Sequence, residues 1–468
     1  MTDRRSLTVL LWLVAIGFFM QTLDSTIVNT ALPAMAKSLG ESPLRMQSVV
    51  VGYSLTMAML IPASGWLADR FGTRLTFFMA IVLFVIGSAL CASSRTLGQL
   101  VASRVLQGMG GAMLLPVGRL AVLRTFPREE FLRAMAFVSV PGLVGPLVGP
   151  TLGGWLAEAA SWHWVFLINI PVGFLGCIAT YLYMPDSKRP DVPPFDLIGY
   201  FLLAFGMAAI SLSIDGLSEL GLRHATVLVL LVFGLSALTS YWLRSVRQEH
   251  PLFPLALFKV HTFSVGLLGN LFARIGSGAM PFLVPLMLQL TMAYSPLGAG
   301  LVMIPMAVAG IFSKQMGTAI INRAGYRRVL VNNTLLLGFA MASFAFAGPS
   351  EPLWLLLVQL AFFGAVNSLQ FTAMNTVTLK DLDTTLASGG NSLMSMIMML
   401  SMSLGVAASG GMLGAFSEVF HSDGRPLETF RATFACIGLI TCASAWIFWQ
   451  LAPDRREQVR EPEKVQVS

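Results

Sequence analysis

The sequence is poor in charge. Only 11% of its 468 residues are Asp, Glu, Lys or Arg, against about 25% in an ordinary soluble domain. Hydrophobic residues make up 55% of the chain, and the mean hydropathy is +0.74. A chain with so few charges cannot cover its surface in water. This composition therefore excludes a soluble globular protein.

Cysteine and histidine are also scarce. The four cysteines lie in apolar runs without metal-ligand or disulfide-framework spacing, and the five histidines show no paired zinc spacing. No G-x-x-x-x-G-K-[ST] phosphate loop occurs, so an ATPase is excluded. We expect no metal and no cofactor, and any uphill movement must use an ion gradient. The cysteines are Cys91, Cys177, Cys436 and Cys442.

Long apolar runs recur along the whole chain. Each is about 20 residues or more, which is enough to cross a bilayer as a helix. They predict an all-α polytopic membrane protein with fourteen spans. The expected spans are 8–33, 45–66, 76–94, 99–118, 133–155, 164–184, 196–215, 225–243, 263–289, 296–316, 329–347, 352–378, 387–416 and 430–451.

The basic residues are unevenly divided between the two sides. The connections on the side of the termini carry 22 of the 30 Lys and Arg residues, and those on the other side carry six. Such an excess marks the cytoplasmic side. Both termini are therefore expected in the cytoplasm. The net charge of +7 follows from this topology, so no nucleic-acid partner is expected.

A short string after span 2 returns after span 10. Residues 65–74 read GWLADRFGTR, and residues 322–328 read NRAGYRR. Arg70, Gly72 and Arg74 have counterparts 253 positions further on. Repeated halves are typical of secondary transporters that rock around a central site. In the first copy, Gly65 and Gly72 allow close helix approach and a tight turn, and Asp69 can pair with Arg70, Arg74 or a neighbouring helix end. These five residues predict a gating loop.

The G-x-L-A-D-R-x-G-x-R string resembles the signature loop of the major facilitator superfamily. Fourteen spans resemble its drug:proton antiporter branch. Four further stretches are similar to that branch at corresponding places: LDSTIVNTALP, SWHWVFLINIPVG, FDLIGY and PLFPLALFKVHTF.

The resemblance implies a 6+2+6 arrangement. It divides the chain into a six-helix lobe at 1–190, two extra helices at 191–250, a second six-helix lobe at 251–452 and a cytoplasmic tail at 453–468. It implies a monomeric proton-coupled exporter in the bacterial inner membrane. The expected partners are a small-molecule substrate, protons and lipid.

Asp24 stands inside the first span, with Asn29 five residues later. A charge at mid-bilayer costs at least about 2.5 kcal/mol, so such a residue is functional by default. Burial favours the neutral form of a carboxyl group, which could load and release a proton. The alternative is a hydrogen-bonded packing residue near the outer mouth. We assign Asp24 to proton coupling and Asn29 to the substrate path.

Arg104 is a permanent cation inside the fourth span. It shares one helical face with Gln107, Gly108 and Gly111, and this pattern resembles the branch's R-x-x-q-G motif. The motif implies that the arginine takes part in proton transfer by holding a carboxylate or an anionic substrate. We assign Arg104 to proton coupling and, with Gln107, to the substrate path. Contact with Asp24 is one option, and water around each group is the other.

The fifth span repeats glycine at every fourth position and interleaves it with proline. The glycines form a groove for a neighbouring helix, and the prolines remove backbone hydrogen bonds. The pattern resembles the superfamily's antiporter motif, which implies export. The residues are Gly145, Pro146, Gly149, Pro150 and Gly153.

Arg274 is a second cation inside a span, the ninth. Either it binds a substrate anion or it pairs with a helix end, and we place it on the substrate path. Two substrate classes stay open: drugs or amphipathic metabolites, and small organic anions such as citrate or iron–citrate. A membrane-embedded sensor or enzyme is a remote third function, since no nucleophile–base motif occurs.

Overall fold

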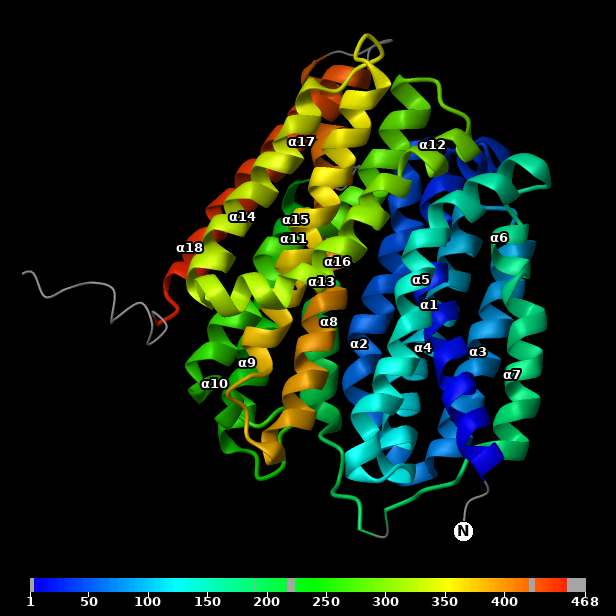
Figure 1. Ribbon diagram of the computed structural model, residues 1–468, viewed down its shortest axis with the longest axis vertical. Coiled ribbons are helices and arrows are strands. Elements are labelled where there is room, and N and C mark those ends of the chain that lie inside the picture. The colour runs from blue at the N-terminus through cyan, green and yellow to red at the C-terminus, as the bar shows by residue number, and fades with distance from the viewer. Residues whose placement is uncertain (1–3, 190, 217–223, 421–425, 453–468) are drawn as a thin grey trace, which may run out of the picture.

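The chain folds into a bundle of long helices (Figure 1). This computed structural model describes residues 4–189, 191–216, 224–420 and 426–452. Within these ranges the regular structure is entirely helical. Fourteen helices are long and apolar enough to cross a membrane, and each predicted span overlaps one of them. The all-α fourteen-helix prediction is confirmed.

The elements follow the chain in this order: α1 (Arg4–Leu39), η1 (Pro43–Met46), α2 (Gln47–Phe71), α3 (Thr73–Ser93), α4 (Leu97–Thr125), α5 (Arg128–Ala159), α6 (Trp164–Leu167), α7 (Asn169–Tyr183), α8 (Leu197–Gly216), α9 (His224–Arg247), α10 (Ala256–Lys259), α11 (His261–Thr291), α12 (Pro296–Val302), α13 (Ile304–Ala324), α14 (Tyr326–Ser343), η2 (Phe344–Phe346), α15 (Leu353–Leu379), α16 (Thr384–Val419), α17 (Pro426–Ala443) and α18 (Ala445–Trp449).

We call the end of the bundle where α1 begins the inner end, and the opposite end the outer end. Helices α1–α7 are the N-terminal group and α10–α18 the C-terminal group; they occupy different sides of the bundle in Figure 1. Helices dominate because a bilayer supplies no water to bond free N–H and C=O groups.

The two copies of the repeated string make the same turn. Gly72 ends α2 with φ 96°, and Gly325 ends α13 with φ 82°. Each donates its N–H back into its helix, to Ala68 and Ile321 respectively. Glycine is favoured at both positions because a Cβ is strained in this backbone region. The repeat thus extends from sequence to local geometry.

The two groups are joined at the outer end. Thr151 of α5 donates to the Gly300 carbonyl at 3.2 Å, and the Leu297 N–H donates to Glu158 at 3.2 Å. Gln289 of α11 donates to the Thr30 carbonyl of α1 at 3.0 Å. One apolar cluster there contains residues from both groups.

Towards the inner end the apolar clusters separate. One is built from the N-terminal group, with Met399 of α16 packed against it, and another from the C-terminal group alone. A further cluster keeps α2 next to α8, α11 and α16. On the other flank, Val144 of α5 and Phe312 of α13 are exposed. The shared apolar cluster therefore lies at the outer end, whereas towards the inner end the groups meet along α2 and α16 and through a 3.0 Å hydrogen bond from Arg119 to Asn391.

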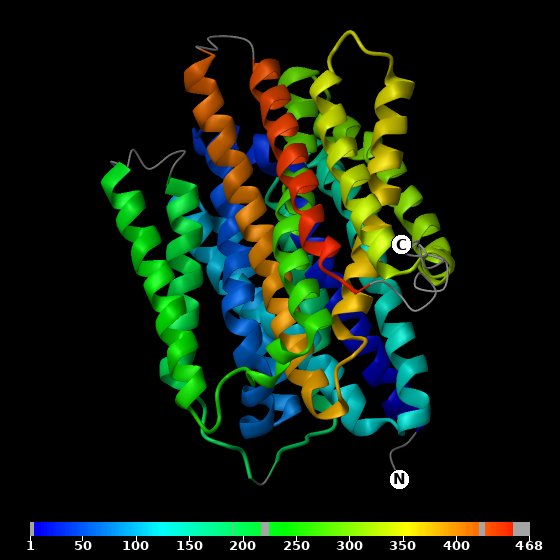
Figure 2. The same cartoon turned by 90° about the vertical axis from the view of Figure 1, so that its left-hand side faces the viewer.

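Helices α8 and α9 form a pair at one edge of the bundle (Figure 2). They approach closely where Gly206 meets Gly234. Asp196 caps α8 through the Gly199 N–H at 3.0 Å and pairs with Arg244 of α9 at 3.1 Å. Helix α8 packs on α2 and α16. The proposed 6+2+6 division stays a prediction, and the predicted tail at 453–468 lies outside the described residues.

Lys314 corrects one detail of the sequence reading. It was counted with the connections on the side of the termini, but it lies inside α13, ten residues before the helix ends. Its side chain is exposed. The predicted span 296–316 also contains Lys314, so counting this lysine with the connections disagreed with that span.

Candidate functional site

Asp24 and Arg104 lie against each other inside the N-terminal group. Their side chains are 0% and 1% exposed, and Arg104 Nη1 lies 2.6 Å from Asp24 Oδ2. By helical rise, Asp24 lies about 30 Å along α1 from its start and about 22 Å from its end. The sequence left open whether Asp24 and Arg104 contact each other or are each surrounded by water. The structure shows direct contact.

Gln107 closes a ring with this ion pair. Its Oε1 accepts from Arg104 Nη1 at 2.6 Å, and its Nε2 donates to Asp24 Oδ1 at 2.8 Å. Arg104 and Gln107 are one turn apart on α4, so both face α1. The same Nε2 donates to Ser88 Oγ on α3 at 2.8 Å. Gln107 therefore holds both charged partners and is itself held from α3.

Asn169, the first residue of α7, completes the ring. Its Nδ2 lies 3.2 Å from Asp24 Oδ1 and 3.2 Å from Ser88 Oγ. The Asp24 carboxylate therefore accepts from arginine, glutamine and asparagine donors. Hydrogen bonds to a carboxylate favour its charged form and offset part of its lost hydration.

Tyr53 of α2 covers the guanidinium of Arg104. The Arg104 Cζ lies 4.1 Å from the centre of the Tyr53 ring and 5.7 Å from that of Phe166. Such cation–π contacts are strengthened where water is excluded. Glycine permits this packing, since a Cβ at Gly111 would lie 2.8 Å from the Tyr53 hydroxyl oxygen.

The sequence reading missed four members of the cluster: Ser88, Cys91, Asn169 and Tyr53. Cys91 Sγ lies 3.7 Å from Gln107 Oε1, so one of the four cysteines touches the site. The one available signal was Asn169, which lies within the stretch SWHWVFLINIPVG.

Asn29 does not join this cluster. It is 3% exposed, and its Nδ2 contacts the Ser25 carbonyl of its own helix at 3.4 Å. Five residues along a helix turn a side chain about 140° away from Asp24. Its Oδ1 is buried without a hydrogen-bond partner among the described residues.

The glycines of α5 face α1. A Cβ at Gly145 or Gly149 would collide with the hydroxyl of Thr22 or Thr26. A Cβ at Gly153 would collide with the Ile27 carbonyl. Thr30 donates to the Pro150 carbonyl at 3.0 Å. Helix α5 runs unbroken through its prolines, and Pro146 is exposed. The α5 groove thus holds the helix that carries Asp24.

The loop at the inner end pairs with the end of a neighbouring helix. Asp69 forms an ion pair with Arg124 at the end of α4, and lies 3.8 Å from Arg189. Arg74 instead donates to the Met184 carbonyl at 2.5 Å, and Arg70 is exposed. Of the three partners expected for Asp69, which were Arg70, Arg74 and a neighbouring helix end, the structure shows the last, because Arg124 stands in the final turn of α4.

The two glycines of that loop differ. A Cβ on Gly72 would meet Asp186 and Lys188, so the close approach expected there is present. Gly65 is exposed, and a Cβ would meet no atom within 4 Å. The close helix approach expected at Gly65 is therefore wrong.

Arg274 of α11 lies in the C-terminal group and is half-buried. Its Nη2 donates to Asn270 Oδ1 at 3.2 Å, and its Cζ lies 4.5 Å from the centre of the Phe371 ring. Within the described residues, no carboxylate lies within ion-pair distance of Arg274. Of the two readings from sequence, pairing with a helix end finds no contact here.

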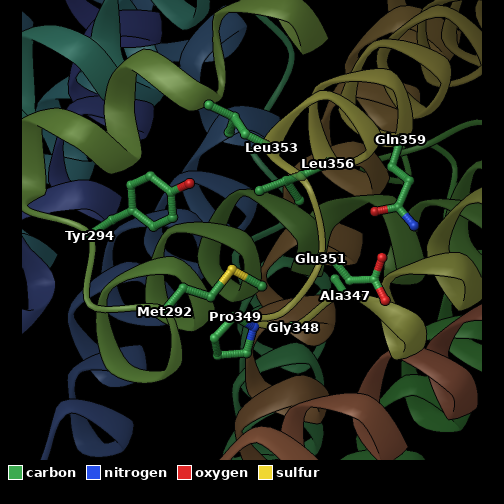
Figure 3. Close-up of a pocket in the computed structure, with 9 residues that line it drawn as sticks. All are labelled: Met292, Tyr294, Ala347, Gly348, Pro349, Glu351, Leu353, Leu356 and Gln359. Atoms are coloured by element: carbon green, nitrogen blue, oxygen red, sulfur yellow. The ribbon is translucent and has the colours of Figure 1, made fainter.

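A pocket at the outer end holds none of the residues singled out from the sequence (Figure 3). It lies where the α11–α12 connection meets the α14–α15 connection. Figure 3 shows its lining side chains, which are Met292, Tyr294, Ala347, Gly348, Pro349, Glu351, Leu353, Leu356 and Gln359. It carries no cation to match Arg104 or Arg274.

Solved structures share this fold. The crystal structure of a D-xylose–proton symporter matches with a TM-score of 0.68 and 14% identity, covering 95% of this chain and 98% of that one. A POT family transporter in complex with 5-aminolevulinic acid matches with a TM-score of 0.66 and 14% identity, covering 95% of both chains. At such low identity the likeness concerns the fold alone.

Sequence relatives match over nearly the whole chain. The "Putative multidrug resistance protein MdtD" of Pectobacterium atrosepticum is 52% identical over 460 residues, which cover 98% of each chain. The protein of that name from Serratia proteamaculans is 52% identical over 457 residues, covering 97% of this chain and 96% of the relative.

The family model described as Major Facilitator Superfamily matches residues 14–406, a range that includes the Asp24–Arg104 cluster, the α5 groove, the Gly72 and Gly325 turns and Arg274. With the helical bundle, the repeated turn and the long relatives, this match is decisive: the chain is a multi-pass membrane transporter that belongs to the major facilitator superfamily.

Proposed function

We propose that the chain is a proton-coupled secondary active exporter of drugs or amphipathic metabolites, working by alternating access as a substrate:proton antiporter. The observation that carries this proposal is the fully enclosed Asp24–Arg104 ion pair. The proposal places the chain in the bacterial inner membrane as a monomer, with both termini in the cytoplasm. The proton gradient drives it, and no cofactor is needed.

The ion pair supplies the coupling in this proposal. Removing one charge from a buried pair leaves the other uncompensated, which costs about 3–5 kcal/mol. Proton uptake by Asp24 therefore weakens the enclosed arrangement and favours a conformer in which Arg104 reaches water or another partner. The conformer with the pair formed and the outer end closed corresponds to the stage after the proton has left towards the inner side.

The α1–α5 contact supplies the link to movement. Asp24 lies on α1, and α1 is held in the α5 groove, whose outer end meets α12. A change at Asp24 can therefore reach the contact between the two groups through one helix. Asp69, Arg124 and Arg189 clamp the inner end of the N-terminal group, so it moves as a unit. These contacts support export by rocking of two groups.

The experiment uses purified protein in liposomes with an imposed pH gradient. The measured quantity is the uptake into the liposomes, or the loss from them, of a cationic dye and of citrate with and without iron. Asp24→Asn is expected to abolish gradient-driven flux because the amide cannot carry a proton. Glu351→Gln, at the exposed pocket of the outer end, is the matched control and should transport as the unmodified protein does.

Unchanged flux in the Asp24→Asn protein would remove Asp24 from proton coupling. Thermal unfolding of both variants separates a lost function from a lost fold.

A second candidate function is export of small organic anions such as citrate or iron–citrate. It is favoured by the state of the two buried carboxylates, Asp24 and Asp196, which pair with Arg104 and Arg244. In the described part of the chain, no buried carboxylate is left to attract a cationic drug. Competition by citrate but not by cationic dyes in the liposome experiment would select this candidate.

A further inference from the structure

Arg274 has bonding capacity that the protein does not use. Its Nε is buried without a hydrogen-bond partner among the described residues, and the one side-chain acceptor it meets is the neutral Asn270. A buried donor left without a hydrogen bond costs about 1–3 kcal/mol, and more when it is charged. In a helix that spans a membrane, such a cation points to a role in binding a ligand.

Its neighbours hold the guanidinium in place. Asn270 donates to the Gly266 carbonyl at 3.0 Å and to Thr378 Oγ1 at 3.2 Å, which fixes its own Oδ1 towards Arg274. Phe371 covers one face of the guanidinium at 4.5 Å. Phe371 is 39% exposed, so the ring also offers an apolar surface beside the cation.

The side chain points towards the space between the two helix groups. Four turns further along α11, on the same side of the helix, Gln289 contacts the Thr30 carbonyl of α1. At the outer end this face is closed by α1. At the level of Arg274 the residue is half-buried, so it is less enclosed than Asp24 and Arg104.

The depth of Arg274 argues against a lipid headgroup. It is 13 residues from the start of α11 and 17 from its end, or about 20 Å and about 26 Å by helical rise. Lipid phosphates lie at the faces of a hydrocarbon layer about 30 Å thick. A dissolved solute entering between the groups can reach this depth.

We propose that Arg274, Asn270 and Phe371 form a substrate subsite for an organic anion whose carboxylate adjoins an aromatic or other apolar body. The planar guanidinium takes the carboxylate, because its fork of donors matches two oxygens. Phe371 takes the adjoining apolar part by stacking or edge contact. The inference deepens the proposed transport function by naming the substrate class, and it assigns substrate and proton to different helix groups.

The test is equilibrium binding of 1-naphthoate to the purified full chain in lipid nanodiscs, with uncharged 1-naphthamide as the matched ligand. Naphthoate should bind at least about tenfold more tightly than naphthamide, since a charge-assisted bond is lost in the amide. Arg274→Gln should lower the affinity for naphthoate by at least about tenfold and leave the affinity for naphthamide unchanged. Arg95→Gln, in an exposed connection at the outer end, should change neither affinity.

Equal binding of naphthoate and naphthamide, or full naphthoate affinity in Arg274→Gln, would overturn the subsite. Should Arg274→Gln fail to fold, Arg274→Lys keeps the charge. Its affinity for naphthoate should lie between the affinities of the unmodified protein for naphthoate and for naphthamide. Citrate or inorganic phosphate binding more tightly than naphthoate would overturn the apolar part of the assignment.

This experiment is separate from proton coupling because it uses no gradient. The Asp24→Asn protein keeps Arg274, Asn270 and Phe371, so its preference for naphthoate over naphthamide should persist whichever conformer it favours. Loss of that preference in Arg274→Gln and its persistence in Asp24→Asn support the subsite even if gradient-driven flux is absent.

Discussion

Arg104 and Arg274 are both arginines inside membrane-spanning helices, but their surroundings differ. Arg104 is 1% exposed and pairs with a carboxylate that glutamine and asparagine also hold. Arg274 is half-buried and meets one neutral side-chain amide and an aromatic ring. The protein itself supplies the charge partner and hydrogen bonds of Arg104, whereas Arg274 keeps donor capacity for a bound anion. We infer that the N-terminal group handles the proton and the C-terminal group handles the substrate.

The largest expected effect follows from breaking the satisfied pair. Arg104→Gln leaves the buried Asp24 carboxylate without its cation, so we expect a loss of about 3–5 kcal/mol in the free energy of unfolding and no gradient-driven flux. Chemical or thermal unfolding in detergent and flux in liposomes measure the two effects.

The double variant Asp24→Asn/Arg104→Gln provides the control, because it removes both charges. It should regain most of the lost stability and none of the flux. A double variant as unstable as Arg104→Gln alone would show that packing, and not the uncompensated charge, dominates.

Removing Arg274 should leave stability almost unchanged and weaken substrate binding. Arg274→Gln takes away a cation that no carboxylate among the described residues compensates, so the free energy of unfolding should stay within about 1 kcal/mol of its original value or rise. Substrate affinity should fall at least about tenfold. If instead Arg274→Gln destabilised as strongly as Arg104→Gln, the contrast between the two arginines would be lost.

The contrast also depends on α5 holding α1, which carries Asp24. Gly153→Ala places a Cβ against the backbone carbonyl of Ile27, which cannot move aside as a side chain can. We expect a loss of about 1–3 kcal/mol in stability, as for other overpacked sites. Gly65→Ala is the matched control because its Cβ meets nothing within 4 Å. Equal melting temperatures for the two variants would argue against the groove.

The smallest expected effect concerns Asn169, which donates to Asp24 Oδ1 at 3.2 Å. Asn169→Ala removes one of the donors that hold the Asp24 carboxylate, so we expect a loss of about 1 kcal/mol in the free energy of unfolding and a partial loss of gradient-driven flux. Unfolding in detergent and flux in liposomes measure the two effects. A variant with unchanged stability and unchanged flux would exclude Asn169 from holding Asp24.

The sequence predicted the helices and the central charged residues well, for a physical reason. Apolar runs are a direct consequence of the bilayer, and a charge inside such a run stands out. Asp24 and Arg104 were found in this way, and Gln107 was found because it shares a helical face with Arg104. Ser88, Cys91 and Tyr53 were missed because small or aromatic polar residues are ordinary in membrane helices.

The partners of the charged residues could not be read from spacing. Asn169 is 145 residues from Asp24, and their contact arises from the way α7 packs near α1. Arg189 approaches Asp69 because the chain after α7 returns beneath the α2–α3 turn. Likewise, only the assembled helices show that the described part of the chain brings no carboxylate to Arg274.

The most direct measurement compares two kinds of naphthoate transport in liposomes: exchange across the membrane without a pH gradient, and accumulation driven by one. With separate sites for proton and substrate, Asp24→Asn keeps exchange and loses accumulation, whereas Arg274→Gln loses both. The account would be contradicted by gradient-driven accumulation in Asp24→Asn, or by undiminished exchange in Arg274→Gln.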